Sequence, residues 1–358
     1  MKSFPKVHRV QLDVRSPLHV GDGTTITKKE YHVANGRIQI LDIPKLYSAL
    51  SGKGAAAEKE FEDYLLLKKT FTTVSDLVRR YSLRLQDYVR YELDNSLERD
   101  DFRKLEIKAF IKDPYGYPYI PGSSLKGAIR TALIAYRIYH SSDLKAYFMN
   151  NFDPNQKDIG KFSRALEKKF DGPGERKFLS GLTVSDSKPV MEKDALVLAQ
   201  KVDYSLDLKS PREHYLPIFR EALRPKIKVD FTITLDTDSL GGIDISYIRE
   251  ALDFYQKQAY RYFHQVIDKD IGDDHDGTIW LGGGAGFTSK SIIYQIFESR
   301  AFKVANDIFR SQLNPKIYQK HNHDKEEYRS KLTPHMGKCT MYNNLLYDMG
   351  RARITFID

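Results

Sequence analysis

One stretch of fifteen residues, Tyr119–Leu133, constrains the fold of this chain more than any other. It contains Pro121-Gly122, a pair that interrupts regular structure, and then Ser123 and Ser124, which are favourable N-cap residues. A helical pattern follows at once, with apolar residues on one face at Leu125, Ile129, Ala132, Leu133 and Tyr136. The stretch therefore predicts a turn followed by an amphipathic helix that packs on a core.

Cations lie on the neighbouring face of this predicted helix, at Lys126, Arg130 and Arg137. The first N–H groups of a helix have no partner within the helix, and the helix dipole makes this end attractive to anions. Hydroxyls at the helix start and cations one turn further on would complete a site for phosphate. The alternative is an ordinary capped helix with no ligand.

Composition suggests a polyanionic partner. The chain has 358 residues, enough for two domains, and its 41% apolar share is sufficient for folded cores. The formal net charge of +9 favours nucleic acid or an anionic membrane surface. The basic residues are spread along the chain, which favours a groove on a folded body over a basic arm. A basic protein without such a partner is the alternative.

The sequence predicts a soluble cytoplasmic protein that has no membrane partner. Cys339 is the single cysteine, so a disulfide within the chain is impossible, as expected in a reducing compartment. Residues 1–6 lack the apolar core of a signal peptide, and no run approaches the roughly 18 apolar residues that span a bilayer.

Periodicity divides the chain into two α+β halves. The first half opens with a strand over 10–14, a glycine-rich turn over 16–23 and a hairpin around Asn35-Gly36. Asp42 is a plausible N-cap for the next helix. A helical pattern from Glu58 to about Leu97 indicates an insertion, either an RNA or partner surface or a solvated charged face.

The second half begins after a predicted loop at 211–215, where we place the domain boundary. It contains an alternating strand over 227–235, a long helix after Gly241-Gly242 and a closing strand over 351–357. The predicted fold class is α+β, with two ferredoxin-like or RRM-like domains over 1–210 and 211–358, the first carrying the insertion at about 58–97.

A glycine run in the second half is the other candidate binding element. Gly282, Gly283, Gly284 and Gly286 precede Phe287, where a dinucleotide-binding fingerprint needs Gly or Ala. No Gly-Lys-Ser/Thr of a Walker A loop occurs in the chain. The run allows close approach of another backbone, and Thr288, Ser289 and Lys290 can donate to phosphates. A turn with a purely structural role is the alternative.

We expect no metal and no cofactor. Ligand-type residues occur at His321, His323, His335 and Cys339, but their spacing matches no zinc pattern. The acidic loop at 270–276 lacks the final Glu of a calcium loop. The enzymatic alternative is a metal-independent endoribonuclease that uses His19 or Asp22. A scaffold that binds only acidic proteins is a further alternative.

Four segments together resemble the RAMP superfamily of CRISPR proteins. They are Ser16–Gly23, Ile120–Leu133, Gly181–Ser187 and Leu281–Lys290, and they span nearly the whole chain. Within the first two, Ser-Pro-Leu-His-Val-Gly-Asp-Gly and Pro-Gly-Ser-Ser-Leu-Lys-Gly-Ala-Ile-Arg-Thr-Ala are similar to the capping subunit of type III-A (Csm) complexes. The glycine-rich loop alone would indicate only the superfamily.

The resemblance implies two RAMP domains in a non-catalytic RNA-binding subunit of a type III-A CRISPR complex. Such a subunit ends the backbone filament near the 3′ portion of the CRISPR RNA, contacts neighbouring Csm backbone subunits and assists maturation of that RNA, with host ribonucleases as possible partners. Asp22 lies near the cleavage position of the backbone subunit, but its Gly-Asp-Gly context differs, so we assign no catalytic residue. The implied RNA contacts are His19, Ser123, Ser124, Lys126, Arg130, Gly282, Gly283, Gly284, Gly286 and Lys290.

Overall fold

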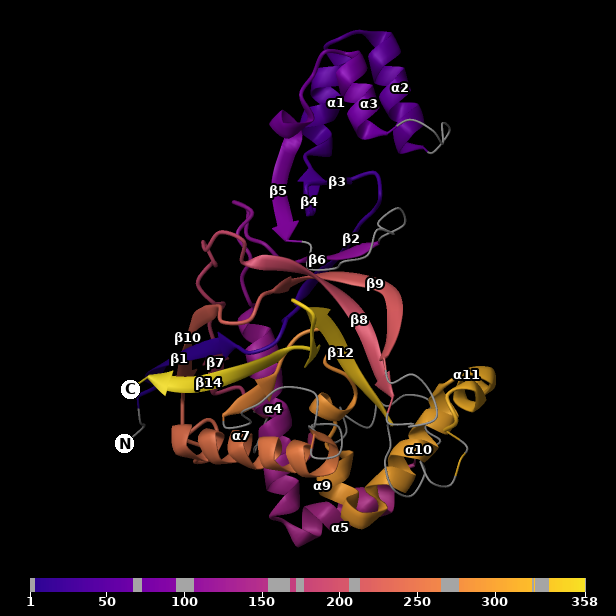
Figure 1. Cartoon of the computed structure of the whole chain (residues 1–358). Coiled ribbons are helices and arrows are strands. Elements are labelled where there is room, and N and C mark those ends of the chain that lie inside the picture. The colour runs from indigo at the N-terminus through magenta and orange to yellow at the C-terminus, as the bar shows by residue number, and fades with distance from the viewer. Residues whose placement is uncertain are drawn as a thin grey trace.

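The computed structural model describes residues 4–66, 73–94, 106–153, 168–171, 177–205, 213–264, 277–323, 325 and 335–357. Within these ranges the chain forms two sheets, helices packed on them and a separate helical head, which Figure 1 shows at the top of the molecule. The acidic loop at 270–276 and most of the polar segment at 153–176 lie outside the described residues.

The first sheet is antiparallel and has the spatial order β11-β14-β1-β10-β7. Its strands are β1 (Lys6–Val14), β7 (Leu182–Val184), β10 (Lys228–Leu235), β11 (Thr278–Trp280) and β14 (Arg351–Ile357). Helices α4 (Gly122–Tyr139) and α7 (Ile245–Ala259) share the apolar core of this sheet. A π-helical turn, Tyr260–His264, continues α7.

A ferredoxin-like unit emerges from this sheet. The elements β1, α4, β7, β10, α7 and β11 follow one another in the βαββαβ order, and β14 is inserted between the last and first of these strands. The predicted α+β class with ferredoxin-like character is therefore confirmed. Both sheets combine strands from either side of residue 210. The domain boundary predicted there does not separate the two sheets, and it stays a prediction.

The second sheet is larger and follows the path β2-β6-β9-β8-β5-β4-β3, with β12 paired to β8 and β13 to β12. Its strands are β2 (Gly21–Ile26), β3 (Tyr31–Ala34), β4 (Arg37–Leu41), β5 (Val89–Asp94), β6 (Ile107–Phe110), β8 (Leu196–Ser205), β9 (Glu213–Leu223), β12 (Met336–Tyr342) and β13 (Leu345–Asp348). The predicted hairpin at Asn35-Gly36 joins β3 to β4, and both turn residues have positive φ.

The loop predicted at 211–215 is wrong where the structure describes it, because residues 213–215 begin β9 and pair with β8. The strand contains Pro217, although proline cannot donate to a β-ladder. The pairing register between β8 and β9 shifts between Gln200 and Val202, and Pro217 falls within the part of β9 that this shift leaves out of register. A β-bulge is one of the few places where a strand tolerates proline.

The helical head is built by α1 (Ile43–Ser51), α2 (Ala55–Leu65) and α3 (Val74–Arg80), followed by a 3₁₀ turn, Leu85–Tyr88. It has an apolar core of its own around Leu46, Phe61 and Leu77. Asp42 caps α1, as predicted, by accepting the N–H of Lys45 over 3.0 Å. The continuous helical pattern predicted from Glu58 to Leu97 is wrong at 89–94, which form β5. Residues 67–72 and 95–97 lie outside the described part.

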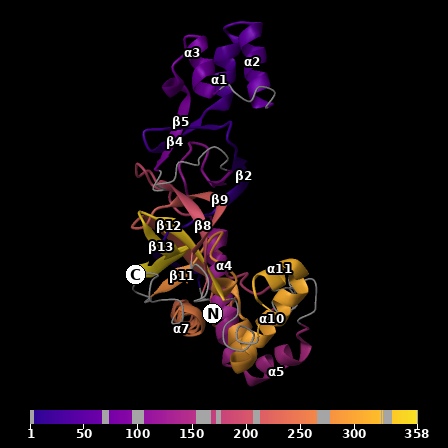
Figure 2. The same ribbon diagram turned by 45° about the vertical axis from the view of Figure 1, so that its right-hand side comes forward.

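A second group of helices packs at the other end of the molecule. It comprises α5 (Ser142–Asn151), α9 (Ile293–Phe297), α10 (Ala301–Gln312) and α11 (Pro315–Lys320), with 3₁₀ turns at Thr288–Lys290 and Glu298–Arg300. Figures 1 and 2 both show α10 and α11 on the side of the body away from the C-terminus. None of the helices in the described part of the chain is long and apolar enough to cross a membrane.

Candidate nucleic-acid interface

A cavity of about 310 Å³ lies between α4, α7, β11 and the glycine-rich loop. Five of the ten residues predicted to contact RNA line it: Ser123, Ser124, Arg130, Gly282 and Lys290. The start of α4 and the glycine-rich loop are far apart in the sequence, with 149 positions from Leu133 to Gly282. Both nevertheless line the same cavity. The arrangement places hydroxyls and cations of both elements around a single hollow.

Two of the four segments of the RAMP resemblance, 120–133 and 281–290, line this cavity, and each is hydrogen-bonded to one of the other two. Ile120 and Ser187 exchange hydrogen bonds, because the Ile120 N–H donates to the Ser187 hydroxyl over 2.9 Å and the Ser187 N–H donates to the Ile120 carbonyl over 2.9 Å. On the opposite side, the Gly283 N–H donates to the carbonyl of His19 over 2.7 Å. The segment that leads into α4 and the glycine-rich loop are thus each held by hydrogen bonds to another of the four segments.

Helix α4 begins at Gly122, which corrects the prediction that Ser123 or Ser124 is the N-cap. Pro121 occupies the N-cap position, and the helix start receives a carboxylate from outside: the Gly122 N–H donates to Asp186 Oδ1 over 2.8 Å. A Cβ on Gly122 would lie 2.2 Å from the carbonyl oxygen of Val184, so only glycine allows this approach. Both serines consequently lie in the first helical turn, beside the cavity.

The glycine-rich loop makes equally close contacts. A Cβ on Gly282 would lie 1.9 Å from the carbonyl oxygen of His19, and Gly282, Gly284 and Gly286 all have positive φ. The Lys290 ammonium folds back and donates to the Gly282 carbonyl. Desolvation lowers the pKa of Lys290. The run therefore has a structural role, which was the alternative interpretation, and it also borders the cavity.

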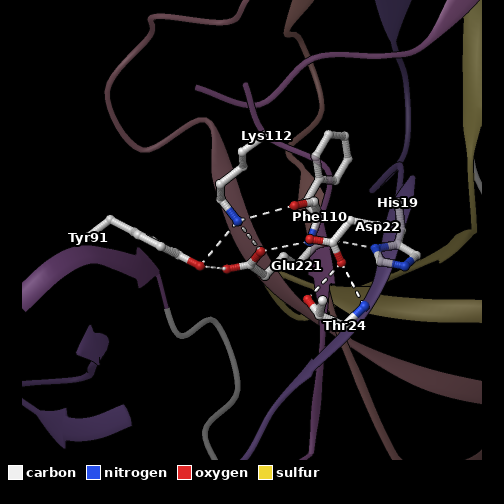
Figure 3. A network of polar contacts seen from close by, with 7 residues as sticks. All are labelled: His19, Asp22, Thr24, Tyr91, Phe110, Lys112 and Glu221. Atoms are coloured by element: carbon white, nitrogen blue, oxygen red, sulfur yellow. Dashed lines mark hydrogen bonds and ion pairs between the residues drawn. The ribbon is translucent and has the colours of Figure 1, made fainter. Parts of the chain in front are cut away.

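His19 is not exposed to a substrate. Its side chain is 6% exposed, and its Nδ1 donates to the backbone carbonyl of Glu221 over 2.7 Å, as Figure 3 shows. Burial lowers the pKa of His19 to about 4, so the ring is neutral at pH 7. A buried neutral ring held in this way does not favour the alternative in which His19 acts as the acid or base of an endoribonuclease.

Behind His19 lies a buried ionic network centred on Glu221, which is fully buried. Its carboxylate accepts hydrogen bonds from the Lys112 ammonium over 2.5 Å, the Phe110 N–H over 2.7 Å and the Tyr91 hydroxyl over 2.5 Å. Burial, and then the Glu221 charge, raise the pKa of Tyr91, which keeps this hydroxyl a donor. Tyr91 belongs to β5, the strand that follows the helical head, and Glu221 belongs to β9. The network therefore links the head to β9, whose Glu221 carbonyl also accepts the hydrogen bond from His19.

Lys126 also points into the protein. Its ammonium donates to the carbonyls of Leu182 over 2.5 Å and Leu179 over 3.2 Å, and burial lowers its pKa. It does not line the cavity that Arg130 and Lys290 share. The two cations therefore differ in role although the sequence places them one helical turn apart: Lys126 holds the segment that precedes β7, whereas Arg130 is exposed at the cavity.

The sequence interpretation missed two cations next to the glycine-rich loop, Arg220 and Lys338, and a third, Lys201, that shares a carboxylate with Lys338. A Cβ on Gly284 would lie 3.4 Å from the guanidinium carbon of Arg220, and one on Gly286 would lie 3.0 Å from Cγ of Lys338. Lys338 pairs with Asp203 over 2.9 Å, and Lys201 lies 3.6 Å from the same carboxylate. These residues come from β8, β9 and β12, so no local spacing in the sequence connects them.

Within the described residues, no group of three or more His, Cys, Asp or Glu side chains is arranged to hold a metal ion. His323 and His335 do lie together, with ring centroids 4.7 Å apart, but their neighbours include Phe309 and Tyr318 rather than further ligands. The site that the structure brings together is thus one of hydroxyls, backbone and cations.

This fold and this cavity define a RAMP-type protein. The model of the RAMP superfamily matches residues 11–289, and the chain belongs to that superfamily. Among its relatives, the CRISPR system Cms protein Csm5 of Streptococcus thermophilus is 28% identical over 304 residues, covering 82% of each chain. The protein of the same name from Mycobacterium tuberculosis is 25% identical over 396 residues and covers 99% of each chain. Within the superfamily the chain is thus of the Csm5 type.

Solved structures show the same fold. A chain in the cryo-EM structure of a Csm-crRNA-target RNA ternary complex of a type III-A CRISPR-Cas system superposes with a TM-score of 0.68 at 21% identity, covering 98% of this chain and all of that one. The crystal structure of Csm5 from T. onnurineus gives a TM-score of 0.58 at 21% identity, covering 96% of this chain and 99% of that one.

Proposed function

We propose that this protein is a non-catalytic RNA-binding subunit of a type III-A CRISPR (Csm) effector complex. The observation that carries the proposal is the single cavity shared by the start of α4 and the glycine-rich loop, with Arg130 and Lys290 at its wall. A similar fold occurs in a Csm-crRNA-target RNA complex, which supports CRISPR RNA and Csm backbone subunits as the partners.

The groups around the cavity suit a ribose-phosphate backbone. Ser123 and Ser124 offer hydroxyls, Arg130 offers a guanidinium, and the glycine-rich loop brings backbone close to any bound chain. Such contacts position a nucleic acid without reading its bases. A guide-RNA subunit needs this property, because the sequence of its RNA changes from one guide to the next. His19 and Lys126 support these elements from behind rather than touch the RNA.

The same similarity supports a proposal for the position in the complex. We propose that the subunit caps the backbone filament near the 3′ end of the CRISPR RNA, assists maturation of that RNA with host ribonucleases, and works in the cytoplasm as part of antiviral defence. Relatives of the Csm5 type over nearly the full chain support this assignment.

The test is a comparison of Arg130→Ala with Arg79→Ala. Both arginines are exposed, but Arg79 lies on the helical head and pairs with Asp76. We expect Arg130→Ala to weaken binding equally for RNAs of unrelated sequence and to reduce the slope of log affinity against log salt by about one. Arg79→Ala should leave both quantities unchanged. A loss confined to particular sequences, or no loss with Arg130→Ala, would contradict the proposal.

A further inference from the structure

A second cavity lies on the other side of the glycine-rich loop. It has a volume of about 250 Å³ and is enclosed by the loop, α10, α11 and β12. Gly286, Phe287 and Thr288 form one wall, while Gly282, Ser289 and Lys290 of the same loop face the first cavity. The loop is therefore a wall common to two hollows of different chemistry.

The walls of this second cavity are apolar and aromatic. The Phe287 and Phe309 rings meet edge to face, with centroids 5.1 Å apart, and Phe309 lies 5.6 Å from the ring of His323. Ile317 lines the cavity with 47% of its surface exposed, so it adds apolar surface to the slot that a ligand could reach. Leu313, His321 and Met336 also line the cavity.

Cations lie on the elements that line this apolar hollow. Arg310 on α10 and Lys316 and Lys320 on α11 are exposed, and Lys338 of β12 lines the cavity itself. Burial, and then the positive charge of Lys338, lower the pKa of His321, which favours a neutral aromatic ring there. An apolar slot with a cationic margin complements a group that is flat and apolar but attached to an anionic chain.

We propose that the second cavity takes one unpaired nucleobase of the RNA whose ribose-phosphate backbone lies in the first cavity. This inference rests on the proposed function. Three features support it: the shared glycine-rich wall, the aromatic lining and the cationic margin. Its volume of about 250 Å³ is just below the roughly 300–1,000 Å³ of pockets that hold drug-sized ligands, as expected for a single ring system. Contacts through ring faces and apolar side chains accept any base.

The experiment measures affinity for a short oligouridylate and for an abasic oligoribonucleotide of the same length, using the full chain. Because a stacked base contributes affinity that the abasic chain lacks, we expect the wild type to bind the oligouridylate about 5-fold to 100-fold more tightly. Ile317→Ser, at a largely exposed position, should reduce this ratio at least about threefold while leaving the affinity for the abasic RNA unchanged.

Ile357→Ser is the matched control. Ile357 is also exposed, at the end of β14, and Figure 1 shows the C-terminus on the side of the body away from α10 and α11. This variant should keep the wild-type ratio. Equal affinity of the wild type for the two RNAs would overturn the base site and leave the proposed backbone site intact. Failure to bind either RNA would overturn both proposals.

A protein occupant would give a different result. If Ile317→Ser loses a co-purifying Csm subunit while the ratio of oligouridylate to abasic affinity stays at the wild-type value, the cavity binds protein and the inference is wrong. Cross-links from 4-thiouridine-substituted RNA provide an independent readout. We expect adducts within 286–288, 309–323 or 336–338, the segments that line the cavity, and adducts confined to other parts of the chain would also count against the base site.

Discussion

The backbone of Gly282 lies so close to that of His19 that a Cβ on Gly282 would stand 1.9 Å from the His19 carbonyl oxygen. The adjacent Gly283 N–H donates to the same oxygen over 2.7 Å. Two glycine-containing segments, 16–23 and 282–286, are thereby joined into one unit beside the candidate RNA cavity. The position of the glycine-rich loop at 282–286 thus depends on the turn at 16–23, near the N-terminus.

Gly282→Ala tests this contact. The substitution adds an atom where the backbone of His19 already lies and does so at φ +73°, so we expect a loss of at least about 3 kcal/mol in the free energy of unfolding. Gly36→Ala is a matched control, because Gly36 has φ +70° but no atom near its missing Cβ. It should cost only about 1 kcal/mol. Denaturant titrations that give equal losses would show that the contact with His19 is unimportant.

His19 predicts a dependence of stability on pH. Its pKa is about 4 in the folded chain against 6.5 ordinarily, so between these values the unfolded chain binds more protons. The stability from the neutral buried ring is therefore complete above about pH 6.5 and is lost as the pH falls toward 4, by about 3 kcal/mol in total.

His19→Gln isolates this contribution, because glutamine can donate to the Glu221 carbonyl but does not titrate. Urea unfolding of both proteins at pH 7 and pH 4.5 should show the wild type losing more stability than the variant over this interval. Equal losses would mean that His19 is accessible to protons in the folded chain.

The network around Glu221 predicts strong energetic coupling. Lys112→Met leaves a fully buried carboxylate without its counter-ion and should cost about 3–5 kcal/mol in the free energy of unfolding. Adding Glu221→Gln removes the stranded charge, so the double variant should be more stable than the sum of the single effects by about 1–3 kcal/mol. A double-mutant cycle measures this difference, and strictly additive losses would argue against a buried ion pair.

Lys126 and Arg130 should separate stability from RNA binding. Lys126→Met removes two hydrogen bonds to the carbonyls of Leu179 and Leu182 and should lower the free energy of unfolding by about 1–3 kcal/mol. Its folded fraction should bind RNA like the wild type. Arg130→Ala should cost less than about 1 kcal/mol in stability and should weaken RNA binding.

Thermal unfolding and filter binding on the same preparations provide both measurements. The assignment of roles would be reversed if Lys126→Met weakened RNA binding as much as Arg130→Ala while keeping wild-type stability.

Local patterns predicted much of the secondary structure. Asn35-Gly36 forms the expected hairpin turn, Asp42 caps its helix, and the alternation over 227–235 corresponds to β10, Lys228–Leu235. These features succeed because turn chemistry, capping and strand periodicity act over a few residues. The start of β9 was instead predicted as a loop at 211–215, because its strand character depends on pairing with β8, a partner that local sequence does not show.

The candidate site was likewise predicted only in part from the sequence. Glycines, serines and cations at the start of α4 and in the run at 282–290 were predicted as phosphate contacts, and five of those residues do line one cavity. The sequence could not distinguish Lys126 from Arg130, because the direction of each ammonium or guanidinium is set by which carbonyls lie nearby. Nor could it indicate Arg220 on β9 and Lys338 on β12. Both approach the glycine-rich loop from strands that pair with β8.

The amino-acid sequence by itself determined where many of the turns lie, which faces of its helices are apolar, and that the glycine run at 282–286 would allow close backbone approach. Only the tertiary structure decided that the start of α4 and the glycine-rich loop face one cavity, that His19 is buried and neutral, and that a second, aromatic hollow lies on the other side of the same loop. The reason is physical: turn and helix preferences arise from neighbours in the chain, whereas burial, charge pairing and cavity walls arise from residues that only folding brings together.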